Sequence, residues 1–132
     1  YTYEKVPYDL WSEAAFGTSI SDLLGLQRNH FDRLVHLLYG LLVTPAFMQL
    51  LDAHIVMRGG WRYLIPLTFM ASQSALYEVI EWGAAVVFGG DLGQAYLGTQ
   101  GDVWDAQKDS ALALLGSLVS VICIRLYQRR RG

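Results

Sequence analysis

Three pairs of ionisable residues, each spaced by three or four positions, interrupt otherwise apolar stretches of this chain. The pairs are Asp32 and His36, Glu78 and Glu81, and Asp105 and Asp109. These spacings place both members of a pair on one face of a helix. An imidazole and five carboxylates can bind a divalent cation such as Zn, Mn, Mg or Fe, or can transfer protons during catalysis. The residue types therefore predict a cation site or an acid–base site, provided that the three pairs meet in space.

The elements that carry the pairs are long and apolar. The chain has 132 residues, of which 53% are hydrophobic, a length that fits one domain. Apolar stretches over about residues 34–51, 63–88 and 110–126 are long enough to cross roughly 30 Å of hydrocarbon. A soluble bundle would show polar stripes through them. The sequence predicts an all-α integral membrane bundle of three transmembrane helices, preceded by a short extracytoplasmic surface helix over 10–16 with Asp9 as its N-cap.

The distribution of basic residues predicts the orientation. The connection between the first two spans carries Arg58 and Arg62 against Asp52, and the tail carries Arg125 and the run 129–131 without an acid. By the positive-inside rule this side, with the C-terminus, is cytoplasmic. Segment 1–33 and loop 89–109 are then extracytoplasmic. The arginine tail is interpreted as a topology signal and not as a nucleic-acid site.

One ionisable residue from each predicted span lies at a similar depth. His36, Glu78 and Asp109 each stand 16 residues from a charged residue at the cytoplasmic side. At 1.5 Å per residue this distance is roughly 24 Å, which places all three within the outer leaflet. Because charges at this depth are costly when they face lipid, we expect the three helix faces to turn toward one another.

Clustered buried carboxylates must share protons, pair with arginine or bind a cation. Three outcomes therefore stay open: a metal site, a metal-free catalytic or substrate-binding site, and a structural network neutralised by arginine. The predicted metal ligands are His36, Glu78, Glu81, Asp105 and Asp109. The predicted catalytic residues are Asp32, His36 and Glu78, with His36 as general base oriented by Asp32. The predicted supporting residues are Arg28, Arg33, Gln100 and Asp102.

Simpler roles compete at two of the neighbouring positions. Asp102 precedes an apolar helix and could serve only as its N-cap. His30 could be a fourth ligand, but we interpret it as a solvated loop residue. Cys123 is the only cysteine, so the chain has no internal disulfide. The chain contains no G-x-S-x-G elbow, Walker loop or HExxH motif.

Three longer motifs resemble a known group of proteins. The segments 27–36 (QRNHFDRLVH), 77–82 (YEVIEW) and 97–107 (LGTQGDVWDAQ) are similar to those of the YjdF-type family of bacterial inner-membrane proteins. The family has no known function and usually carries further membrane helices before this region. Because the chain also begins at Tyr1, the resemblance implies that residues 1–132 are a single membrane domain from the C-terminal part of a longer chain.

A wider resemblance is to the VanZ-like proteins, which are linked to low-level teicoplanin resistance. Their pattern is Asp-Lys-x-x-His, Glu-x-x-Gln and Asp-x-x-x-Asn before a glycine. This chain departs from it at Arg33, Glu81 and Asp109, and Gly116 matches the glycine. Two of the departures add negative charge, which favours a cation at the site.

Two functions follow as hypotheses. The first is a metal-dependent membrane enzyme acting on an envelope lipid or lipid-linked substrate at the outer leaflet. The second is a non-enzymatic accessory subunit of a larger membrane assembly or oligomer, in which the polar cluster only fixes the helices or docks a partner.

Overall fold

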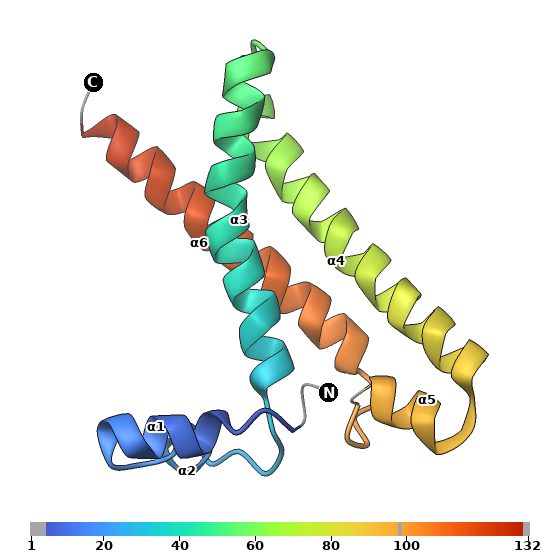
Figure 1. Cartoon of the computed structure of the whole chain (residues 1–132). Coiled ribbons are helices and arrows are strands. Elements are labelled where there is room, and N and C mark those ends of the chain that lie inside the picture. Colours follow the sequence, from blue (N-terminus) through green and yellow to red (C-terminus); the bar gives the residue numbers. More distant parts are fainter. Residues whose placement is uncertain (1–4, 98, 131–132) are drawn as a thin grey trace.

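The computed structural model describes residues 5–97 and 99–130, and these residues form helices joined by short connections, without a strand. The helices are α1 (Tyr8–Phe16), α2 (Ile20–Leu24), α3 (Phe31–His54), α4 (Trp61–Phe88), α5 (Gly90–Leu97) and α6 (Asp105–Arg129). The long helices α3, α4 and α6 form an open bundle, and the short helices lie at one of its ends (Figure 1). The all-α prediction is confirmed. Gly98 of the third motif and Arg131 of the basic tail lie outside the described residues.

Two of the long helices, α3 and α6, have the length and hydropathy of a membrane span. Helix α4 has 28 residues and is about 42 Å long, but it is not one of these two. Its sequence includes Pro66, the polar run 72–74 and the pair Glu78 and Glu81, all of which lower its hydropathy. The crossing of the membrane by α4 therefore stays a prediction.

The closest helix contact is the crossing of α3 and α6, where glycines replace larger side chains. A methyl group on Gly40 would overlap the backbone carbonyl of Ala113, and one on Gly116 would overlap the carbonyl of Leu37. Small residues at such positions let two membrane helices approach backbone to backbone. At this crossing the backbones of α3 and α6 therefore lie in direct contact.

Hydroxyl groups continue this contact toward the middle of the two helices. The Thr44 and Ser117 hydroxyls form a hydrogen bond of 2.5 Å, and both residues are fully buried. The Ser120 hydroxyl donates to the Leu41 carbonyl of the facing helix. Such bonds between helices satisfy polar groups that lipid cannot solvate.

The predicted surface helix begins earlier than expected. Helix α1 starts at Tyr8 with Pro7 in the N-cap position, so the prediction that Asp9 caps it was wrong. The Asp9 carboxylate instead accepts hydrogen bonds from the backbone N–H and the hydroxyl of Ser21, at 3.0 and 2.7 Å. A carboxylate inside the first helical turn is free to bind a neighbouring segment, and here it ties α1 to α2.

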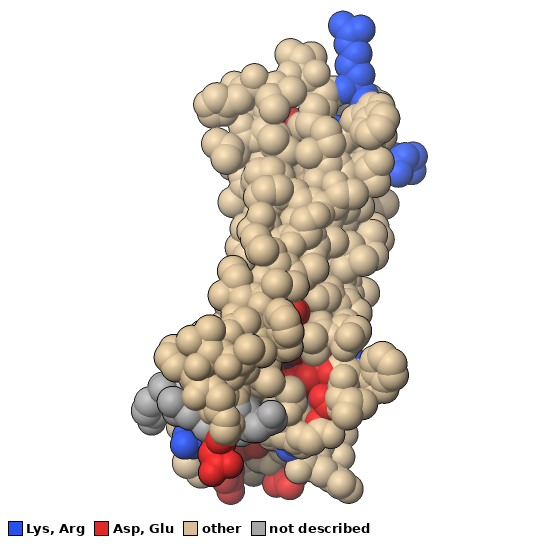
Figure 2. All heavy atoms as spheres, turned by 90° about the vertical axis from the view of Figure 1, so that its right-hand side faces the viewer, with Lys and Arg blue, Asp and Glu red and all other residues tan. Residues whose placement is uncertain are grey.

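Charged side chains separate to the two ends of the molecule. On the face that Figure 2 shows, most Asp and Glu lie at the end that carries α1, α2 and α5, and an apolar band separates them from the Lys and Arg at the other end. At the basic end the Arg62 guanidinium donates to both oxygens of Asp52, at 3.0 and 2.5 Å. This distribution agrees with the predicted orientation, which itself stays a prediction.

Candidate functional site

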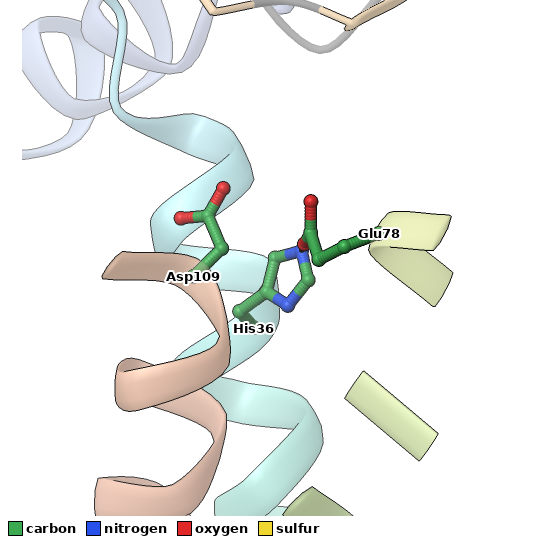
Figure 3. Close-up of side chains that lie close together, drawn as sticks. All are labelled: His36, Glu78 and Asp109. Atoms are coloured by element: carbon green, nitrogen blue, oxygen red, sulfur yellow. The ribbon is translucent and has the colours of Figure 1, made fainter. Parts of the chain in front are cut away.

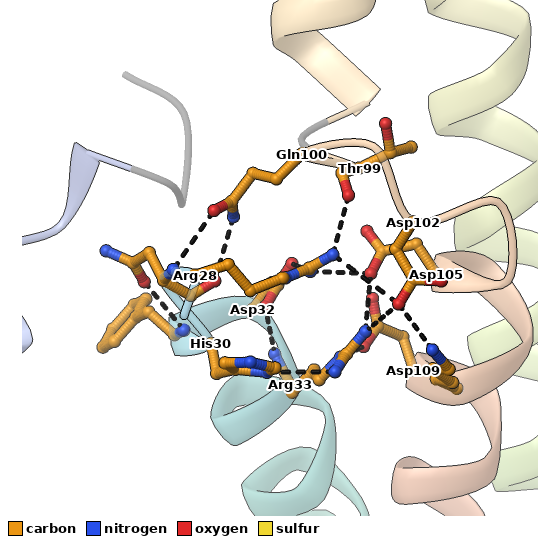
Figure 4. Close-up of polar contacts among 12 residues, drawn as sticks. Arg28, His30, Asp32, Arg33, Thr99, Gln100, Asp102, Asp105 and Asp109 are labelled. Atoms are coloured by element: carbon orange, nitrogen blue, oxygen red, sulfur yellow. Dashed lines mark hydrogen bonds and ion pairs between the residues drawn. The ribbon is translucent and has the colours of Figure 1, made fainter. Parts of the chain in front are cut away.

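An arginine from the segment before α3 connects that segment to α6. The Arg28 guanidinium donates to Asp105 at 2.7 Å, to Asp32 at 3.1 Å and to the Thr99 carbonyl at 2.7 Å (Figure 4). Its side chain is only 15% exposed. Arg28 therefore neutralises buried carboxylates from two helices and also holds the connection that leads into α6.

Arg33, one turn into α3, completes this group. Its guanidinium donates to Asp102 at 2.6 Å and to Asp105 at 3.2 Å, and it lies 3.0 Å from Nδ1 of His30. Burial and the two nearby arginines lower the pKa of His30, so its neutral imidazole accepts this hydrogen bond. His30 therefore lies in the loop before α3, as interpreted, but it is partly buried and its ring is hydrogen-bonded to Arg33.

Asp102 lies at the outer edge of this network. Its carboxylate accepts from the Lys108 ammonium at 2.6 Å and from the Trp104 backbone N–H at 3.1 Å, in addition to Arg33. The Lys108 ammonium, the Trp104 N–H and the Arg33 guanidinium hold the pKa of Asp102 well below its ordinary value. The N-cap position of α6 belongs to Trp104, so Asp102 is an ion-pair residue and not the cap.

The charges of this outer network balance. Three cations face three carboxylates, so each acid has a cationic partner. The cations are Arg28, Arg33 and Lys108, and the carboxylates are Asp32, Asp102 and Asp105. We call these six residues the arginine network. Any further acid at this end of the bundle needs another source of positive charge.

Next to the network, on its membrane side, a second group forms from three different helices. His36 of α3, Glu78 of α4 and Asp109 of α6 point toward one another (Figure 3). One donor atom from each lies within 4.8 Å of the others. The His36 Nε2 atom is 3.4 Å from Glu78 Oε1, and its Nδ1 atom is 3.3 Å from the Ser74 hydroxyl. We call His36, Glu78 and Asp109 the inner triad.

Two carboxylate oxygens of the inner triad are buried without a hydrogen-bond partner among the described residues. They are Glu78 Oε1 and Asp109 Oδ1. The nearest arginine atom, Arg33 Nε, is 3.9 Å from Asp109 Oδ1 and makes no hydrogen bond with it. A buried, unpaired carboxylate oxygen is costly unless a proton or a cation satisfies it. Among the described residues, the inner triad is therefore the part of the cluster that accepts no hydrogen bond from an arginine.

A cavity adjoins the inner triad between α3 and α4. It has a volume of about 250 Å³ and is lined by Val35, His36, Tyr39, Gln73, Ser74, Leu76, Tyr77 and Ile80. A second, shallower hollow on the other side of Glu78 lies between α4 and α6, next to Trp82 and Gln107. The triad therefore lies beside two openings in the bundle and is not sealed by packed side chains.

The structure thus divides the predicted ligand set. His36, Glu78 and Asp109 come together as predicted from their depth. Asp105 is 5% exposed and engaged by both arginines, so it belongs to the network. Glu81 is in neither group of close donors among the described residues and instead interacts with the Tyr77 hydroxyl. Asp105 also lies in a second group of close donors, with Asp32 and Asp109, so its metal role stays a prediction, whereas Glu81 lies outside both groups of described residues.

Asp32 does not orient His36 as predicted. The Asp32 carboxylate pairs with Arg28, whereas the two ring nitrogens of His36 face Ser74 and Glu78. Gln100 supports the site indirectly, because its amide group makes two hydrogen bonds with the Asn29 backbone, at 2.9 and 3.1 Å. These bonds hold the connection before α6 against the segment before α3.

Sequence reasoning missed two residues that line the inner site. Ser74 bonds to His36, and Tyr77 packs edge-on against its ring with the centroids 5.8 Å apart. One signal was available, because Ser74 and Tyr77 precede Glu78 by four and one positions, and Ser74 therefore shares its helix face. Neither residue type indicates a site unless the facing helix is known.

Comparison with known proteins agrees with the membrane character of this fold. The chain is 37% identical over 132 residues to the inner membrane protein YjdF of Escherichia coli (strain K12), covering 99% of this chain and 59% of that relative. The chain therefore spans about three-fifths of the length of this relative. No solved structure matches. The YjdF-type resemblance is thereby confirmed, and the wider VanZ-like resemblance stays a prediction. A family model described as "Predicted membrane protein (DUF2238)" matches residues 1–130, and the chain belongs to this family.

Proposed function

We propose that the protein is a membrane-embedded enzyme whose inner triad binds a divalent cation and acts on an envelope lipid or lipid-linked substrate. The observation that carries the proposal is the pair of buried, unpaired oxygens on Glu78 and Asp109 beside the His36 imidazole. Of the arginine network only Arg33 comes within ion-pair distance of them, 3.9 Å from Asp109 and without a hydrogen bond, because its three cations already face three carboxylates.

The chemistry of the donors supports a cation more than a shared proton alone. One imidazole nitrogen and two carboxylates form a ligand set suited to Zn, Mn or Fe, and with water to Mg. Ligand bonds of about 2.0–2.2 Å place donors on opposite sides of one ion roughly 4 Å apart. Donor atoms within 4.8 Å of one another need only small side-chain movements to reach this geometry. A cation held there would activate water or polarise a phosphoryl or carbonyl group.

Elemental analysis of the purified protein tests the metal. We expect wild-type protein in detergent to retain a divalent metal, and Asp109→Asn to lose it, because the amide removes a charged ligand without changing the shape of the side chain. Glu81→Gln is the matched control, since it neutralises an acid on the same end of α4 outside the triad. The metal proposal fails if wild-type protein holds no metal and added Zn, Mn or Mg does not raise its thermal stability, as ligand binding must.

The arginine network supports the alternative of a non-enzymatic accessory subunit. Arg28 joins α6 to the segment before α3, and Arg33 joins α6 to α3 itself, as a purely structural cluster would. Under this alternative Glu78→Gln should keep or raise stability, because it removes a buried charge whose near partner, the His36 Nε2 atom at 3.4 Å, makes no hydrogen bond with it. Under the enzyme proposal the same variant loses metal and loses any metal-dependent rise in thermal stability.

A further inference from the structure

The cavity between α3 and α4 suits a hydrocarbon chain. Its walls are mostly aliphatic and aromatic, with Val35 and Tyr39 from α3 and Leu76 and Ile80 from α4. Its volume of about 250 Å³ is below the roughly 300–1,000 Å³ of sites that enclose a whole drug-sized molecule. The cavity therefore accommodates part of a slender apolar ligand better than a complete polar metabolite.

The mouth of the cavity lies on the apolar surface of the bundle. Leu76 and Ile80 are 51% and 56% exposed, and they continue from the wall of the cavity onto the outer face of α4. The opposite wall belongs to α3, which has the length and hydropathy of a membrane span. With α4 also crossing the membrane, as the sequence predicts, a side opening between α3 and α4 faces lipid, so lipid is the molecule at the mouth.

The inner wall of the cavity is polar and belongs to the site. His36 lines both the cavity and the inner triad, and Ser74 holds the His36 ring at this boundary. Tyr39 and Gln73 lie about one helical turn further from the network end than His36 and Tyr77. The cavity therefore runs from the triad toward the middle of the bilayer, which is the direction in which the acyl chain of a lipid extends from its headgroup.

We infer that the α3–α4 cavity binds one hydrocarbon chain of a bilayer lipid, which enters sideways from the membrane. Binding of the chain places the bond nearest the lipid headgroup at the inner triad. This inference rests on the proposed function for its chemistry, since it names the substrate class as a lipid recognised first by its chain. It assigns Leu76 and Ile80 to the entrance and Val35 and Tyr39 to the facing wall.

Photo-crosslinking in nanodiscs tests the inference. The probe is phosphatidylethanolamine with a diazirine in one acyl chain, diluted into phosphatidylethanolamine and phosphatidylglycerol. We expect labelled peptides to map to residues 35–39 and 73–80. Leu76→Trp, which fills the entrance, should reduce this labelling about fivefold or more, because it removes the apolar space in which the chain is buried. Leu115→Trp is the control, since Leu115 is an equally exposed apolar residue of α6 at 49%.

Folding and chemistry are separated from chain binding by two further variants. Ile80→Trp fills the same entrance from the next turn, so agreement between it and Leu76→Trp at unchanged thermal stability excludes a folding defect. Asp109→Asn, at a triad residue outside the cavity lining, should lose metal but keep the labelling of 35–39 and 73–80. If wild-type protein holds no metal but is still labelled at residues 35–39 and 73–80, only the enzyme proposal fails. Labelling spread evenly over α3, α4 and α6, and unaffected by Leu76→Trp, would overturn the cavity inference.

Discussion

At the residue scale, the arginine network and the inner triad differ in whether their buried carboxylates are hydrogen-bonded to arginine. Arg28 connects Asp32 and Asp105 directly, at distances typical of charge-assisted hydrogen bonds. Glu78 and Asp109 lie in the same cluster but keep unpaired oxygens. This difference separates residues that hold the helices together from residues that are available to a ligand.

Replacing Arg28 by alanine should strongly destabilise the protein. Two buried carboxylates would lose their common partner, a change that costs roughly 3–5 kcal/mol in buried ion pairs. Arg28→Lys should recover only part of this loss, because an ammonium cannot reproduce the planar geometry that bonds three acceptors. The free energy of unfolding in mixed micelles measures the effects of Arg28→Ala and Arg28→Lys. Arg129→Ala, at an exposed position, should change it little, and an equally small effect of Arg28→Ala would contradict the ion-pair role.

Acid should weaken the connection before α6 through Asp102. Its pKa lies below the ordinary value of 3.8, so the folded state favours the ionised form. The resulting stabilisation is fully present above this ordinary pKa and is lost as the pH falls through the lower folded-state pKa. The midpoint temperature of thermal unfolding should therefore decrease as the pH is lowered below about 4. The Asp102→Asn variant should show a smaller decrease over the same pH range. Parallel pH profiles for the two proteins would exclude Asp102 as the titrating group.

At the element scale, α3 and α6 form the rigid part of the bundle and α4 completes the site. Glycines and hydroxyl residues bring α3 and α6 into backbone contact. Helix α4 supplies Glu78, Ser74 and Tyr77 and leaves a cavity along its contact with α3. The triad is therefore complete only while α4 keeps its position against the α3–α6 pair.

A methyl group at the crossing should separate α3 from α6. Gly40→Ala places its new carbon against the Ala113 carbonyl, which is backbone and cannot rotate away. We expect a loss of about 1–3 kcal/mol, the usual cost of overpacking. Gly83→Ala is the control, because nothing lies within 4 Å of its added carbon, and alanine in a helix interior gains about 0.5–1 kcal/mol over glycine. Equal effects of the two variants on unfolding would exclude the close crossing.

At the scale of the whole molecule, charge and hydropathy follow one axis. An apolar band separates a mostly acidic end from a basic end (Figure 2). With the basic end in the cytoplasm, the inner triad lies in the outer leaflet. The site would then receive lipid from the bilayer rather than soluble molecules from the cytoplasm.

Single cysteines should reveal this topology and the crossing of α4. In a Cys123→Ser background, Glu13→Cys and Asp91→Cys should react with an impermeant maleimide added to intact cells. Arg58→Cys and Arg129→Cys should react only after permeabilisation. All four positions are exposed. Reaction of positions 58 and 91 from the same side would show that α4 does not cross, and reversal of all four would move the triad to the inner leaflet.

The sequence by itself determined the long helices and the common level of the three triad residues along them. Long apolar runs can satisfy their backbone groups in lipid only as helices, so the three long elements follow from composition and length. The constant rise of a helix then puts His36, Glu78 and Asp109 at one level. The spacing of Asp105 and Glu81 next to them carries no information about which acids arginine neutralises.

Only the tertiary structure decided how the polar cluster divides. Rotation of each helix about its axis, fixed by the crossing at Gly40 and Gly116, places Asp105 toward Arg28 and leaves Asp109 facing His36. Residues one turn apart on the same helix face thereby receive different partners. The partner of a buried charge depends on side chains from other helices, and helical spacing along one chain segment does not specify them.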